Sequence, residues 1–161
     1  MSTPVRIAGI GSCHGVDQAG WRVIEELERC RFGTHYTPGL VSMVCCSSPA
    51  ALPSLIAGAR LVVLVDALGS IRAGEVRCVN TSELAPAGGY TSHGFDVGQA
   101  IELVESLPDC PARITLLGIG VDVFDTGILD PLPEDFAATV IPALVPVIDS
   151  EIRQFLGACR T

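Results

Sequence analysis

The chain has 161 residues, of which 48% are hydrophobic and 17% are charged, and its formal net charge is -8 at pH 7. This length fits one domain over residues 1–161, with enough apolar side chains for a substantial core. The acidic balance argues against a basic nucleic-acid-binding surface, and no apolar run reaches the roughly 18 residues of a membrane span. The N-terminal residues lack a signal-peptide pattern, so we expect a cytoplasmic protein without nucleic-acid or membrane partners.

The seven cysteines show neither CxxC pairs nor zinc-ribbon spacing. We therefore interpret them as reduced thiols that pack as small hydrophobic side chains. Cys13 and the Cys45–Cys46 pair differ from the others because they fall at the ends of predicted strands.

The first part of the chain alternates between predicted strands and helices. Val5–Ile10 is apolar and predicts a buried strand, and an apolar stripe opposite glutamates predicts a helix over Asp17–Arg31. Leu40–Val44 predicts a second strand, and Pro49 suits the first turn of a short helix over Pro49–Ala59. Leu61–Val65 is apolar at every position, which is typical of a strand covered on both faces.

The second part of the chain continues this alternation. Glu75–Val79 has polar residues at alternate positions and predicts a strand near the sheet edge. Phe95–Leu107 predicts a helix, Arg113–Leu117 predicts a buried strand, and Glu134–Ala158 predicts a long helix despite two internal prolines.

Loops are expected at residues 81–91 and 121–133. The order strand, helix, strand, helix, strand, strand, helix, strand, helix predicts an α/β fold. We expect a three-layer α/β/α sandwich with a mostly parallel, five-stranded sheet.

Chemically useful side chains follow the predicted strands. Asp17 follows the first strand, Asp66 comes directly after the apolar third strand, and His93 precedes the helix predicted to begin at Phe95. Functional groups in such sheets gather at the carboxyl ends of the strands. Two carboxylates and one imidazole at one sheet edge would suit a divalent metal, and three protein ligands would leave coordination positions open.

Each of these residues also has a structural interpretation. Asp17 is suited to the first turn of a helix, Asp66 to a turn or helix cap, and His93 to a cap or core position. Cys13 and His14 are further candidate ligands beside Asp17, and ordinary loop residues are the simpler interpretation for both.

A nucleotide-binding glycine loop is the weaker interpretation of the opening segment. In a GxGxxG motif starting at Gly9, the third glycine position is occupied by His14. The second predicted strand leads into Cys45, so no acidic residue stands where a ribose would be bound.

Four segments, in this order, are similar to segments of one family: "GIGSCHGVDQAGWRVIEEL", "LVVLVDALGSIRAGEVRCV", "TSHGFDVGQAIELV" and "ITLLGIGVDVFDTGILDPLPEDF". They resemble the glycine-rich opening, the central strand with its aspartate, the Ser/Thr-x-His segment and the last strand of the hydrogenase maturation proteases. These endopeptidases trim the C-terminus of the nickel-iron hydrogenase large subunit. The resemblance covers about residues 6 to 150.

The resemblance implies a metal-binding and catalytic trio of Asp17, Asp66 and His93. It implies that these residues engage nickel already installed in the large-subunit precursor, which is the partner, and that no organic cofactor takes part. It also implies cleavage near the metal-binding cysteine motif of the precursor. We expect the protein to be a monomer.

The chain departs from the family pattern in its opening turn and after the second strand. Ser12 stands where the family has asparagine, Val16 replaces an aspartate and Gln18 replaces a glycine. The Cys45–Ala50 segment, "CCSSPA", stands where the family has a turn rich in aspartate, glycine and threonine. This leaves an alternative open, in which the chain is a non-catalytic metallocentre-binding or chaperone protein on the same scaffold.

Overall fold

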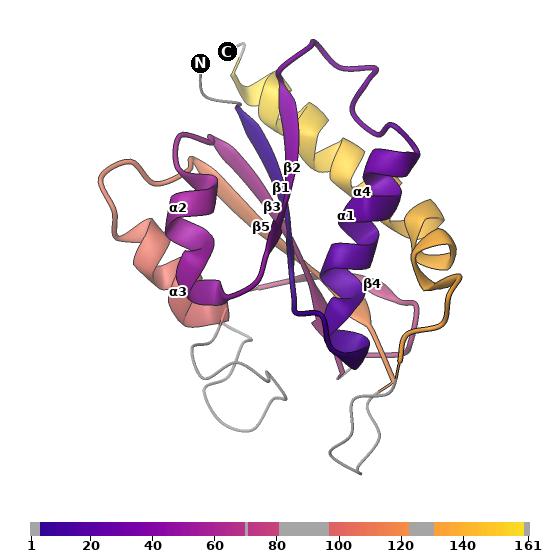
Figure 1. Cartoon of the computed structure of the whole chain (residues 1–161). Coiled ribbons are helices and arrows are strands. Elements are labelled where there is room, and N and C mark those ends of the chain that lie inside the picture. The colour runs from indigo at the N-terminus through magenta and orange to yellow at the C-terminus, as the bar shows by residue number, and fades with distance from the viewer. Residues whose placement is uncertain (1–3, 70, 81–96, 123–130, 160–161) are drawn as a thin grey trace.

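The computed structural model describes residues 4–69, 71–80, 97–122 and 131–159 (Figure 1). A five-stranded sheet lies at the centre of the molecule, with helices packed on both of its faces. The strands are β1 (Val5–Ile10), β2 (Val41–Cys46), β3 (Leu61–Leu68), β4 (Val76–Val79) and β5 (Arg113–Gly120). The helices are the 3-10 turns η1 (Gly15–Gln18) and η2 (Pro49–Ala51), and α1 (Ala19–Arg29), α2 (Leu52–Ile56), α3 (Val97–Glu105) and α4 (Phe136–Ala158).

The strand order is β2-β1-β3-β5-β4. β1 pairs in parallel with β2 and β3, and β3 pairs in parallel with β5. β4 pairs antiparallel with β5 and forms one edge of the sheet. The predicted α/β sandwich with a mostly parallel five-stranded sheet is therefore confirmed.

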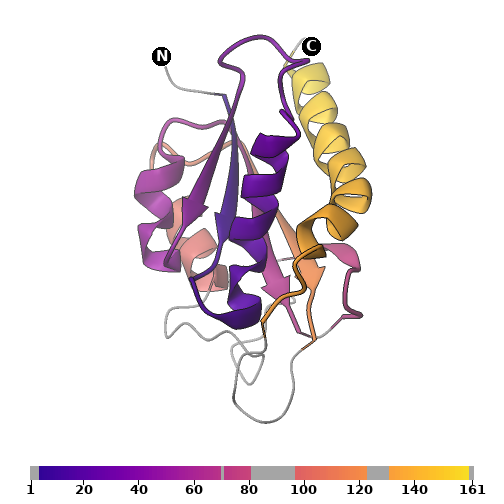
Figure 2. The ribbon, with the colours of Figure 1, turned by 45° about the vertical axis from the view of Figure 1, so that its right-hand side comes forward.

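The two faces of the sheet carry separate apolar cores. α1 and α4 cover one face, and α2 and α3 cover the other, as the two views show (Figures 1 and 2). Side chains alternate along a strand, so Leu61, Val63 and Val65 of β3 enter the first core while Val62 and Leu64 enter the second. This explains why that segment is apolar at every position.

α1 packs unusually close to the sheet because glycines meet at the contact. A Cβ atom at Gly20 would lie 2.7 Å from the carbonyl oxygen of Val65 and closer still to that of Ile10. Gly9 faces the same contact from β1, with the backbone of Gly20 directly opposite. The start of α1 is thereby fixed against the ends of two neighbouring strands.

Two carboxylates on α4 connect that helix to other elements. Asp149 accepts a hydrogen bond from the Tyr36 hydroxyl and one from Arg153 Nε at 2.7 Å. The hydrogen bond from Tyr36 and the positive charge of Arg153 hold the pKa of Asp149 below its ordinary value. Glu151 accepts a hydrogen bond of 2.8 Å from the hydroxyl of Thr115 and so connects α4 to β5 of the sheet.

Several predicted boundaries were wrong by a few residues. The predicted helix over Asp17–Arg31 is instead η1 followed by α1, and Arg31 takes a positive φ of 55° beyond its end. The predicted helix over Pro49–Ala59 is shorter and ends at Ile56. The second strand reaches Cys46, and the predicted loop at residues 81–91 lies outside the described residues.

Two strands are longer than their apolar runs. β3 continues to Leu68 and β5 continues to Gly120 because these ends pair with each other, with Asp66 opposite Gly118 and Leu68 opposite Gly120. Asp66 is therefore a residue of the strand rather than the residue that follows it.

Among the described helices, none combines the length and the apolar character that crossing a membrane would require.

Candidate active site

The direction in which successive strands are added to the sheet reverses between β1 and β3. From β1 the chain passes through α1 to β2, and from β3 it passes to β4 and β5 on the other side. Such a switch point opens a crevice outside the carboxyl ends of the two strands, where α/β proteins bind their ligands. Asp17 follows β1 and Asp66 lies near the end of β3, so both segments flank this switch point.

Asp17 is held by the glycine turn that precedes it. Its carbonyl accepts a hydrogen bond of 3.2 Å from the Ser12 N–H, and its own N–H donates to the carbonyl of His14 at 3.2 Å. A Cβ atom at Gly11 would collide with the Asp17 carbonyl oxygen. The residue is only 8% exposed, and η1, which carries it, contacts β3.

The carbonyl of Cys46 joins three elements at this edge. It accepts hydrogen bonds from the Gly11 N–H at 3.0 Å and from Trp21 Nε1 at 3.1 Å. The end of β2, the glycine turn and the first turn of α1 are therefore fixed to one another.

Asp66 is half-buried, and its Oδ1 accepts a hydrogen bond of 2.8 Å from the N–H of Ala67. The alternation along β3 places Asp66 on the side of Val62 and Leu64, which is the side of the second core. Its carboxylate is therefore held at the margin of an apolar interior.

The thiol of Cys46 lies within the electrostatic reach of Asp66. Cys46 is fully buried, and its Sγ donates to the carbonyl of Ser48 at 3.0 Å. Burial raises the pKa of the Cys46 thiol, and the negative charge of Asp66 adds to that increase. The sequence marked Cys46 only as a residue at a strand end, and this proximity to Asp66 was not predicted.

The other candidates at the strand ends are exposed. The Sγ of Cys13 lies 3.4 Å from Nδ1 of His14, and both side chains face solvent. In the turn after β2, the hydroxyl of Ser48 caps η2 by accepting a hydrogen bond from the N–H of Ala50 at 3.3 Å. The "CCSSPA" segment is thus a defined strand-to-helix turn.

His93 lies outside the described residues, so the convergence of Asp17, Asp66 and His93 stays a prediction. Within the described ranges, no three histidine, cysteine, aspartate or glutamate side chains are grouped so that they could hold a metal ion. The two segments that carry Asp17 and Asp66 do meet at one edge of the sheet.

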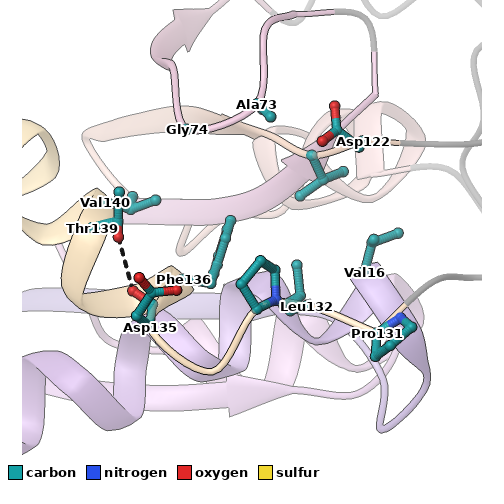
Figure 3. A pocket seen from close by; sticks show the side chains of 13 residues that line it. Val16, Ala73, Gly74, Asp122, Pro131, Leu132, Asp135, Phe136, Thr139 and Val140 are labelled. Atoms are coloured by element: carbon teal, nitrogen blue, oxygen red, sulfur yellow. Dashed lines mark hydrogen bonds between the residues drawn. The ribbon is translucent and has the colours of Figure 1, made fainter.

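A pocket with a volume of about 420 Å³ is lined in part by Val16, the residue before Asp17 (Figure 3). Val16 contributes to its wall, together with residues from the end of β5 and the start of α4. The sequence did not predict this pocket, because its walls come from segments distant along the chain. The "PLP" segment at residues 131–133 is the one local feature of the sequence that could have indicated part of the pocket wall, because its two prolines restrict the backbone.

The fold and this edge define an open, mostly parallel α/β protein with acidic side chains at its switch point. No protein-family model and no curated protein matches the chain by sequence. Among solved structures, the chain is similar to the NiFe hydrogenase maturation protease HycI from Thermococcus kodakarensis KOD1. The two share 25% sequence identity, the alignment covers 94% of each chain, and the TM-score is 0.65.

Two further structures have the same fold. An endopeptidase from Escherichia coli gives a TM-score of 0.70 at 19% identity, with 93% of this chain and 92% of that chain covered. The hydrogenase maturating endopeptidase HybD from E. coli gives 0.59 at 18% identity, with 97% and 91% covered. The predicted resemblance is thus confirmed, and the chain is a structural relative of the hydrogenase maturation proteases.

Proposed function

We propose that the protein is an endopeptidase that removes a C-terminal extension from a nickel-loaded hydrogenase large-subunit precursor. The observation that carries the proposal is its similarity to a NiFe hydrogenase maturation protease over 94% of both chains. The position of Asp17 and Asp66 at the switch point of the sheet supports it. All seven cysteines are free thiols, which fits a reaction in the cytoplasm.

In this proposal the nickel ion belongs to the substrate. Asp17 and Asp66 supply oxygen donors and His93 supplies a nitrogen donor, a set that suits a borderline divalent ion. Hydrolysis consumes one water and yields the shortened large subunit and a free peptide. A carboxylate next to the bound metal is suited to accept the proton of the attacking water.

The direct test follows the mass of the precursor. We expect the nickel-loaded precursor to lose its C-terminal peptide and the nickel-free precursor to keep it, as measured by intact mass spectrometry. Equal trimming of both forms would contradict the proposed dependence on nickel. A stable complex without any change in precursor mass would instead support the non-catalytic alternative.

Variants at the three proposed residues test the site itself. Asp17→Asn and Asp66→Asn should each lower the trimming rate by about 100-fold or more, because loss of a direct ligand should cost at least as much as loss of a supporting residue. Asp109→Asn is the matched control, since Asp109 is exposed in the segment after α3. Trimming at the wild-type rate by Asp17→Asn would remove that residue from the site.

His93→Ala should abolish trimming with little change in melting temperature. A large fall in melting temperature would indicate a structural histidine.

A further inference from the structure

The pocket lined in part by Val16 is apolar on its inner walls. Val16, Phe136 and Val140 are buried there, and Leu132 is partly buried. Its volume of about 420 Å³ lies within the range of about 300–1,000 Å³ typical of ligand sites. We call it the β5–α4 pocket, because the end of β5 and the first turns of α4 contribute to its lining.

The β5–α4 pocket adjoins the proposed active site. Val16 lines the pocket and the next residue, Asp17, is a proposed ligand. Gly120, at the end of β5, also lines the pocket. A polypeptide that contacts Asp17 therefore lies close to the pocket.

Carboxylates mark the margin of the pocket. The ionisable side chains among its lining residues are Asp122 and Asp135, and both are exposed (Figure 3). An apolar side chain gains from leaving water in such a pocket, at about 25 cal/mol per Å² of buried surface. A further carboxylate, brought to this margin by a ligand, is repelled by both aspartates.

We infer that the β5–α4 pocket binds an internal apolar residue of the substrate polypeptide and disfavours an apolar residue that ends in a free carboxylate. This inference rests on the proposed function and adds a specificity-determining subsite to it. The pocket would select an uncut chain over a cut chain whose new C-terminus lies there. Val16 and Leu132 determine the fit of the side chain, and Asp122 and Asp135 determine the discrimination by charge.

Two small probes that differ in one group test the inference without any catalysis. N-acetyl-leucine amide mimics an internal residue, and N-acetyl-leucine carries the free carboxylate. Binding is followed by NMR on methyl-labelled protein, through the signals of Val16, Leu132 and Val140. We expect saturable shifts at these methyl groups, with the amide binding about five- to tenfold more tightly at low salt and the difference shrinking at high salt.

Variants separate the two contributions. Asp122→Asn combined with Asp135→Asn should make the two probes bind equally, whereas Asp109→Asn should leave the difference intact. Leu132→Trp fills the pocket and should remove the shifts at Val16 and Val140. Leu103→Trp, on the exposed face of α3, is the matched control and should leave the shifts at Val16 and Val140 unchanged.

The outcomes distinguish the inference from the proposed function. Absence of saturable shifts at millimolar concentrations of the amide, or equal binding of the two probes to the wild-type protein, overturns the inference even if the precursor is trimmed. Binding of the amide with the expected preference, but without trimming of any precursor, supports the pocket and overturns the protease proposal. If trimming occurs, Leu132→Trp should raise KM for the precursor and leave kcat nearly unchanged.

Discussion

Gly11 lets the backbone carbonyl of Asp17 approach the end of β1. Because a methyl group at this position would overlap that oxygen, Gly11→Ala should displace the turn and lower the free energy of unfolding by roughly 1–3 kcal/mol. Urea denaturation measures this change, and the trimming assay should show a loss of activity as well.

Gly157→Ala is the matched control for this variant. A Cβ atom at Gly157 meets no atom within 4 Å, and the residue lies in α4. Alanine should therefore stabilise the protein by up to about 1 kcal/mol, because it favours the helix. If Gly11→Ala were as stable as this control, the packing of the opening turn would not be as described.

The reactivity of the cysteines reports on the surroundings of Asp66. Six of the seven cysteines are exposed, whereas Cys46 is buried and the pKa of its thiol is raised by burial and by Asp66. We expect iodoacetamide at pH 8 to modify Cys46 last in the native protein, as followed by peptide mass spectrometry. Asp66→Asn should make Cys46 react faster, and an unchanged rate would argue against their proximity.

At the scale of elements, a hydrogen bond connects the segment at residues 32–36 to α4. Tyr36 donates a hydrogen bond to Asp149, and burial, together with this bond, raises the pKa of Tyr36 to about 12. Tyr36→Phe should lower the free energy of unfolding by about 1–2 kcal/mol near pH 7. A double-mutant cycle with Asp149→Asn isolates the pair, and additive effects of the two changes would show that they do not interact.

The pH dependence of this pair follows from the direction of each shift. The pKa of Tyr36 is raised in the folded state, so its contribution is complete below pH 10 and is lost as the pH rises toward about 12. The pKa of Asp149 is lowered, so its contribution is present above its ordinary value of 3.8 and is lost at more acidic pH. The stability difference between wild type and Tyr36→Phe should therefore shrink at both extremes.

Local sequence patterns predicted the elements well but not where their ends meet. Val5–Ile10 was predicted to the residue because a buried strand and its flanking glycine turn are both local signals. The extension of β3 through Asp66 depends on pairing with β5, and periodicity cannot show a partner some 50 residues away. The 3-10 turn before α1 was missed because Asp17 also fits the start of an ordinary helix.

The candidate site was likewise predicted only in part from the sequence. The sequence placed Asp17 and Asp66 at one edge of the sheet, because parallel strands present their carboxyl ends together. It could not show that Cys46 lies near Asp66, or that Val16 and Phe136 share a pocket, because these contacts depend on how the helices pack.

At the scale of the whole molecule, the part of the surface that the structure describes offers little apolar area for self-association. The exposed large hydrophobic residues among those described are Leu103 and Leu107, at 45% and 40% exposure, both near the end of α3. We therefore expect a monomer of 16.8 kDa with a radius of gyration of about 15 Å. Light scattering coupled to size-exclusion chromatography checks the mass, and a value near twice the chain mass would contradict the expectation.

Trp21 is the single tryptophan of the chain, and its indole nitrogen is bonded to the carbonyl that also anchors the glycine turn. Its intrinsic fluorescence is therefore a built-in reporter located a few residues from Asp17. Titration with a precursor or a metal salt can be followed by the wavelength and intensity of its emission, with no label attached to the protein.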